Sequence, residues 1–100
     1  MIDLTFISGN ITHDDLSSLK GISPSDQIDF LKEDMLQVEY CARLLLDVGW
    51  YPSFNINGAF QIRVIKNHHW EEPIFYSKAK TIDSLIEEIV EAQKIISKEA

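Results

Sequence analysis

Residues 36–50 read LQVEYCARLLLDVGW, and they contain two stretches in which apolar side chains alternate with other residues. In the first stretch Gln37 and Glu39 separate the apolar positions, and a similar alternation continues through residues 44–50. Because successive side chains of a strand point to opposite faces, this period of two predicts two half-buried strands. The short link at 41–43 predicts an antiparallel hairpin, although it contains none of the usual turn residues.

Two further strands are predicted downstream of this hairpin. Residues 60–65 alternate until Ile65, and residues 74–79 place Ile74 and Tyr76 on one side. Polar loops precede both strands, and Asn57-Gly58 supplies turn chemistry to the first loop. Because short connections favour hairpins over crossovers, the four strands are expected to be antiparallel.

The chain closes with an amphipathic pattern of helical period. Thr81 is a suitable N-cap, and Asp83 stands in the first turn, where the helix dipole favours an acid. The opposite face carries glutamates and a lysine, which form few favourable charge pairs. Packing must therefore stabilise the helix, and a sheet is needed to cover its apolar stripe. That stripe consists of Ile82, Leu85, Ile86, Ile89, Val90 and Ile96.

The N-terminal part reads less clearly. Residues 24–34 are predicted to form a helix, because Ser23 can cap it and Pro24 suits its first position. Before it, a short strand around residues 4–7 and a short helix from His13 are expected. We therefore interpret residues 1–100 as a single domain, with a peripheral N-terminal segment at 1–22 and a core at 23–98.

These elements together predict an α+β fold, an antiparallel sheet of about four strands with helices packed on one face. The other face would then be partly open to solvent. Side chains on that face, and those of the loops at 50–58 and 67–73, form the natural place for a binding surface.

Composition excludes several classes of protein. The chain has 16 acidic and 9 basic residues, a net charge of −7, and residues 1–50 hold nine of the acids against three bases. Phosphate backbones repel such a chain, so nucleic acid is not expected as a partner. A hydrophobic content of 45% argues against disorder. No apolar run is long enough to cross a bilayer, and no secretory signal is evident, so a cytoplasmic protein is expected.

No motif predicts catalysis, a metal or a cofactor. Cys41 has no local signature of a nucleophile, and we expect a small, partly buried structural cysteine. His68-His69 stands beside Glu71-Glu72, but adjacent histidines in extended chain point to opposite sides and rarely share a metal. The loop is instead expected to be polar, with Trp70 packed into the core. We therefore predict a protein that is not an enzyme.

Several stretches do resemble a known family. They are KEDMLQVEY at 32–40, LDVGWYP at 46–52, GAFQIRVI at 58–65 and WEEP at 70–73. They are similar to small bacterial immunity proteins of polymorphic-toxin and contact-dependent growth inhibition systems, across roughly residues 24–97. The resemblance implies a cytoplasmic protein that binds one cognate toxin domain, often a nuclease, and blocks its active site or substrate groove.

An acidic inhibitor of a basic toxin would present carboxylates around aromatic anchors. Trp50 is expected in the core, whereas the aromatic side chains after it are expected to be exposed. An adaptor or regulatory domain that binds another protein remains an alternative, as does a small enzyme with a dispersed site. The sequence leaves the oligomeric state open. The candidate partner-binding residues are Glu33, Asp34, Glu39, Asp47, Tyr51, Phe54, Glu71 and Glu72.

Overall fold

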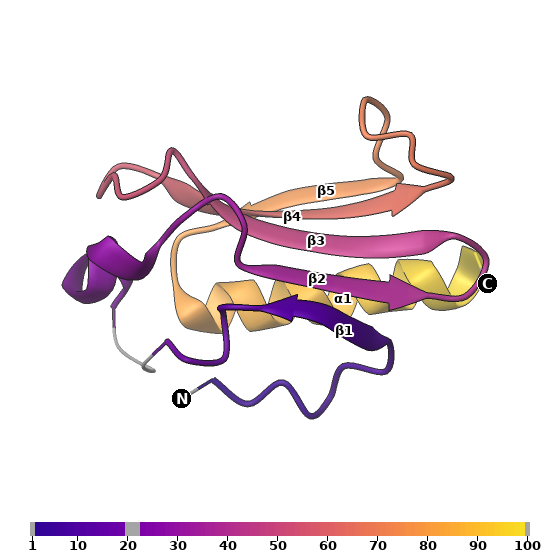
Figure 1. Cartoon of the computed structure of the whole chain (residues 1–100), viewed down its shortest axis with the longest axis horizontal. Coiled ribbons are helices and arrows are strands. Elements are labelled where there is room, and N and C mark those ends of the chain that lie inside the picture. Colours follow the sequence, from indigo (N-terminus) through magenta and orange to yellow (C-terminus); the bar gives the residue numbers. More distant parts are fainter. Residues whose placement is uncertain (1, 20–22, 100) are drawn as a thin grey trace.

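The computed structural model describes residues 2–19 and 23–99 and shows a five-stranded antiparallel sheet with one α-helix across one face (Figure 1). The strand order is β1-β2-β3-β4-β5, so every strand pairs with its neighbour along the chain. The predicted α+β class and the antiparallel sheet are confirmed. The elements are β1 (Asn10–Asp14), the 3-10 helix η1 (Pro24–Phe30), β2 (Leu36–Tyr40), β3 (Leu44–Tyr51), β4 (Ala59–Lys66), β5 (Phe75–Ala79) and α1 (Ile82–Glu99).

The hairpin of β2 and β3 forms as predicted, with Val38 opposite Leu46. Its turn shows how it closes without glycine or asparagine. Ala42 and Arg43 adopt φ angles of 62° and 58°, so two residues of the three-residue link take the left-handed conformation that glycine or asparagine usually supplies. Cys41 is exposed at this turn, so the expectation of a partly buried cysteine is wrong.

The core lies between the sheet and α1. Alternate residues of β2, β3 and β4 are buried, and Trp50 is only 2% exposed, which confirms its predicted place in the core. The N-cap is also confirmed, because the Ser84 amide donates to Thr81 Oγ1 over 3.1 Å. Within residues 2–19 and 23–99, no helix is long and apolar enough to cross a membrane. The helix contributes Leu85, Ile89, Ala92 and Ile96 to the core.

The N-terminal predictions need correction. The expected strand at 4–7 and the helix from His13 do not form, and residues 10–14 instead make β1, paired with β2. Residues 1–22 are also not peripheral where the structure describes them, since β1 widens the sheet and four apolar side chains join the core. Residues 1 and 20–22 lie outside the described part. The four buried side chains are Ile2, Leu4, Leu16 and Leu19.

The predicted helix at 24–34 is also wrong. It is reduced to η1, which contains non-helical dihedral angles at Gln27, and Leu31 is extended. The backbone after η1 bonds to other strands and loops: Leu31 O accepts from the Phe54 amide over 2.7 Å, and Lys32 O accepts from the Trp50 amide over 2.8 Å. These longer-range bonds replace the helical ones, so residues 24–34 do not supply the second covering helix that the sequence predicted. Among the described residues, α1 is the helix that covers the sheet.

Candidate functional site

The face of the sheet opposite α1 carries a row of polar side chains that crosses all five strands. The row consists of His13, Gln37, Asp47, Arg63 and Tyr76, each paired in register with the next. These residues alternate along their strands with the buried residues that pack against α1, which places them on the other side. We call this surface the open face.

Arg63 on β4 contacts two tyrosine rings of the open face. Its guanidinium carbon lies 5.3 Å from the ring centre of Tyr51 and 5.6 Å from that of Tyr76. Its guanidinium also donates a hydrogen bond to Gln61 Oε1 on the same strand. Two cation–π contacts and a charged hydrogen bond fix the orientation of the group before any partner arrives.

Asp47 lies beside Arg63 in this row and is 4% exposed. Gln37 Nε2 donates to Asp47 Oδ1 over 3.3 Å. Burial raises the pKa of the Asp47 carboxyl, as does the nearby Asp34, whereas Gln37 and Arg63 act in the opposite direction. A perturbed carboxyl often marks a functional site. Its neighbours here are an amide and a guanidinium, groups suited to recognition by hydrogen bonds.

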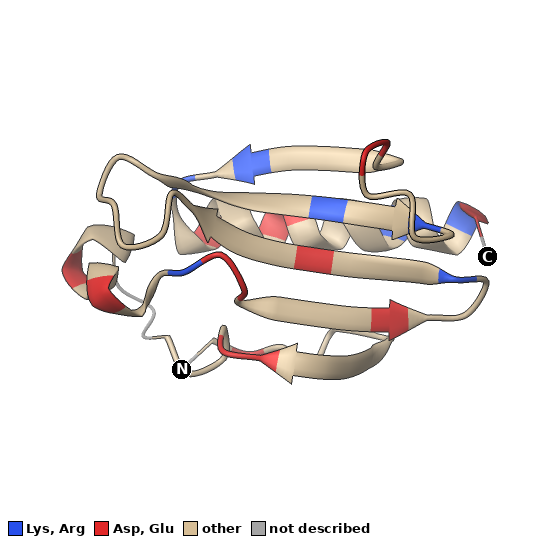
Figure 2. Cartoon of the chain, turned by 45° about the horizontal axis from the view of Figure 1, so that its top comes forward, with Lys and Arg blue, Asp and Glu red and all other residues tan. Residues whose placement is uncertain are grey.

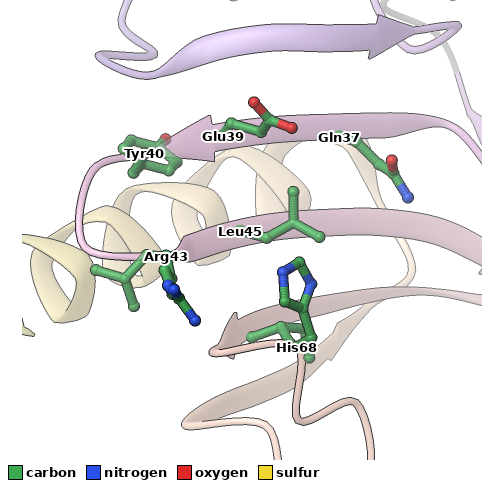
Figure 3. Close-up of a pocket in the computed structure, with 8 residues that line it drawn as sticks. Gln37, Glu39, Tyr40, Arg43, Leu45 and His68 are labelled. Atoms are coloured by element: carbon green, nitrogen blue, oxygen red, sulfur yellow. The ribbon is translucent and has the colours of Figure 1, made fainter.

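A hollow of about 300 Å³ lies on the open face near the β2–β3 turn (Figure 3). Leu45 and Ile65 supply apolar surface, while Glu39, Arg43 and His68 bring polar groups to its lining. Figure 3 shows Arg43 from the turn and His68 from the 67–73 loop reaching the same space near Leu45. Its volume matches the lower end of small-ligand pockets, and it can also hold one side chain of a larger partner.

Charge is divided across the open face. Glu39 and Asp47 lie on β2 and β3, whereas Arg63 and Lys78 lie on β4 and β5 (Figure 2). The Lys32 ammonium, close to the acidic side, forms an ion pair with Asp15 over 2.7 Å. The acidic half of the sequence therefore builds the acidic half of the sheet.

The structure brings five of the eight candidate residues to this surface. Glu39, Asp47 and Tyr51 belong to it directly. Glu33 and Asp34 come from the segment between η1 and β2, which passes over β3 so closely that a Cβ on Gly49 would lie 1.8 Å from Glu33 O.

The other three candidates lie elsewhere. Phe54 is 58% exposed in the 52–58 loop at one end of the sheet. Glu71 and Glu72 lie in the exposed 67–73 loop, which joins β4 to β5 at the other end (Figure 1). Trp70 in that loop is 43% exposed, so its predicted packing into the core is wrong.

The open-face residues that sequence reasoning missed include Gln37, Gln61, Arg63 and Tyr76. The signal that could have found them is strand alternation, because all four occupy positions that alternate with apolar core residues. None of the described residues forms a group of three His, Cys, Asp or Glu side chains able to hold a metal ion.

Comparison of the chain with protein-family models, curated proteins and solved structures finds no match to any of them. The functional argument therefore depends on the geometry of the open face and on the chemistry of the residues that form it.

Proposed function

We propose that this chain is an immunity protein that binds a cognate toxin domain through the open face and neutralises it by covering its active site or substrate groove. The observation that carries the proposal is the uncovered sheet face, on which two tyrosine rings hold Arg63 beside the buried carboxylate of Asp47. In this proposal the protein acts in the cytoplasm and neutralises the toxin by binding alone, without catalytic residues of its own.

The composition of the open face favours a protein partner. Tyrosine and arginine are enriched among the residues that dominate binding energy at protein interfaces. Arg63 already contacts the rings of both Tyr51 and Tyr76 in the free protein. Ordering such side chains on binding costs little entropy, because their conformations are largely set beforehand.

Charge favours a basic partner. The chain has a net charge of −7, and Glu33, Asp34 and Glu39 are exposed on or beside the acidic side of the open face. A nuclease toxin carries positive charge to bind phosphates, and an acidic inhibitor that complements this charge would associate quickly. The resemblance to immunity proteins of toxin systems points to the same kind of partner.

The test is binding to the product of the gene immediately upstream, purified and titrated at low and moderate salt. The variant Asp34→Lys/Glu39→Lys reverses two charges of the acidic side, and Asp83→Lys/Glu87→Lys reverses two exposed charges of α1 as its matched control. We expect a one-to-one complex whose association rate falls about tenfold or more in the first variant and much less in the second. Absence of a complex at low salt would refute the proposal.

A protein-binding adaptor is the second candidate, and one observation favours it. Arg63 and Lys78 place positive charge on the same face as the carboxylates, which suits a partner of mixed charge. Growth of cells that express the upstream gene separates the two functions. An immunity protein restores growth, whereas an adaptor leaves the toxicity unchanged.

A further inference from the structure

Three large apolar side chains are exposed at one end of the molecule. Phe30 is 68% exposed, Phe54 58% and Ile56 63%. Phe30 ends η1, and the other two belong to the 52–58 loop. Figure 1 shows η1 and this loop at the same end of the sheet, and the bond from the Phe54 amide to Leu31 O ties them together over 2.7 Å. We call these three residues the apolar tip.

The loop that carries two of them has a defined backbone. Trp50 Nε1 donates to Asn55 O over 2.9 Å, and the Gly58 amide donates to the same oxygen over 2.9 Å. The Asn57 amide donates to Asn55 Oδ1 over 2.8 Å. A Cβ at Gly58 would lie 2.5 Å from Trp50 Nε1, so the loop packs tightly on the indole. The tip is therefore presented by ordered backbone, which lowers the entropy cost of binding.

Folding does not account for phenylalanine at position 54. Its φ angle is 58°, a left-handed conformation that costs an L-residue other than glycine, asparagine or aspartate roughly 1–2 kcal/mol. Its side chain also leaves more than half of its surface in water. A bulky aromatic residue that is both strained and exposed is better explained by contact with another molecule.

The charges around the tip restrict what that molecule can be. Asp26 and Asp29 are exposed on η1, and Glu33 and Asp34 are exposed just beyond it. Lys32, which lies between these pairs, has its ammonium bound to a carboxylate of Asp15. The η1 side of the tip is therefore negative, whereas Lys78 and Lys80 line a hollow beside Asn57 on the other side of the 52–58 loop. Two copies meeting through the η1 side would bring like charges together, and anionic lipid or nucleic acid would be repelled there.

We infer that the apolar tip inserts into an apolar hollow rimmed by lysine and arginine on the protein partner. This inference rests on the proposed function and adds a second point of attachment to it. The open face supplies the polar contacts, whereas Phe30, Phe54 and Ile56 supply the desolvated apolar anchor that tight interfaces require.

The probe is the purified toxin domain encoded by the upstream gene, titrated against four forms of the full chain. The forms are the wild type, the tip variant Phe30→Ser/Phe54→Asn/Ile56→Ser, the single variant Phe30→Ser, and the matched control Ile11→Ser/Val90→Ser, which removes two exposed apolar side chains elsewhere. Circular dichroism confirms folding, and Phe30→Ser alone carries the test if the tip variant is unfolded.

We expect the tip variant to bind at least 30-fold more weakly, mainly through faster dissociation, and Phe30→Ser to bind about tenfold more weakly. The control is expected to stay within threefold of the wild type. If the wild type binds and the tested variant binds equally well, the inference fails while the proposed function stands. If the wild type does not bind, both fail.

Self-association is the remaining outcome. Sedimentation velocity of the protein alone at high concentration is expected to show a monomer. A dimer that Phe30→Ser converts to a monomer would make the tip an interface between copies and would overturn the inference.

Discussion

Gly49→Ala tests the placement of the segment that carries Glu33 and Asp34. A Cβ at position 49 would lie 1.8 Å from Glu33 O, whereas such contacts are essentially never shorter than 3.0 Å. The obstructing atom belongs to the backbone, so no side-chain rotation can relieve the overlap. The segment and β3 must separate by more than 1 Å.

The cost follows from the bonds that this separation strains. The amides of Met35 and Trp50 donate to Val48 O and Lys32 O over 3.0 and 2.8 Å. Loss of both bonds costs about 1–3 kcal/mol, and overpacking adds about 1–3 kcal/mol. Alanine restricts the unfolded chain and returns about 0.4–1 kcal/mol. Together these contributions predict a loss of about 1–6 kcal/mol in the free energy of unfolding.

Urea denaturation followed by the fluorescence of the buried Trp50 measures this loss. Ser53→Ala is the companion variant, because it removes only the bond from the Glu33 amide to Ser53 Oγ, which is exposed and 3.1 Å long. It should cost about 0.5–1 kcal/mol. If Gly49→Ala costs no more than Ser53→Ala, the segment does not pass over Gly49 and the position of Glu33 on the open face is incorrect.

Three further measurements test other parts of the structure. Asp47→Asn should raise the free energy of unfolding at pH 7, because burial raises the pKa of Asp47 above its ordinary 3.8 and so penalises the ionised form in the folded state. The advantage of the variant should disappear as pH falls below 3.8, and equal stability of the two proteins at pH 7 would contradict this reasoning. Gln93→Ala removes hydrogen bonds to the Ser8 amide, the Tyr40 hydroxyl and Phe6 O, so it should lower the free energy of unfolding by about 1–3 kcal/mol. It should also accelerate hydrogen exchange at the Ser8 amide, and unchanged exchange would show that this contact does not hold the N-terminal segment. Ultraviolet titration should find the pKa of Tyr40 at about 12 because the phenol is partly buried, and a value near 10 would place that ring in solvent.

The sequence predicted those elements whose alternation or helical period is set by the core. Residues 36–40 match β2, and residues 44–50 match β3 to within one residue. β1 was missed because it is an edge strand whose residues are almost all exposed, so its sequence, NITHD, carries no pattern of burial. The turn before β3 depends on backbone strain at Ala42 and Arg43, which their residue types do not reveal.

The site was predicted in part for similar reasons. Local propensity favoured a helix through residue 34, but the backbone of residues 31–35 bonds to other parts of the chain instead, and this pairing brings Glu33 and Asp34 to the open face. Phe30 was not among the candidate residues, because the predicted helix continued past it, whereas η1 ends there and leaves it exposed. The pairing of Arg63 with two tyrosines depends on register between strands, which a single sequence specifies only after the strands are aligned.

The meander order of the sheet also has a consequence for how the chain folds. Each strand pairs with the one before it, so the sheet can assemble as successive hairpins with short loop closures, a topology associated with rapid folding. The helix that covers the apolar face comes last in the sequence. During synthesis the apolar side chains of β3 and β4 therefore stay exposed to solvent until the core residues of α1 leave the ribosome. These residues are Leu85, Ile89, Ala92 and Ile96. We expect nascent chains to remain unable to bind a partner, and prone to aggregation, until this final helix docks.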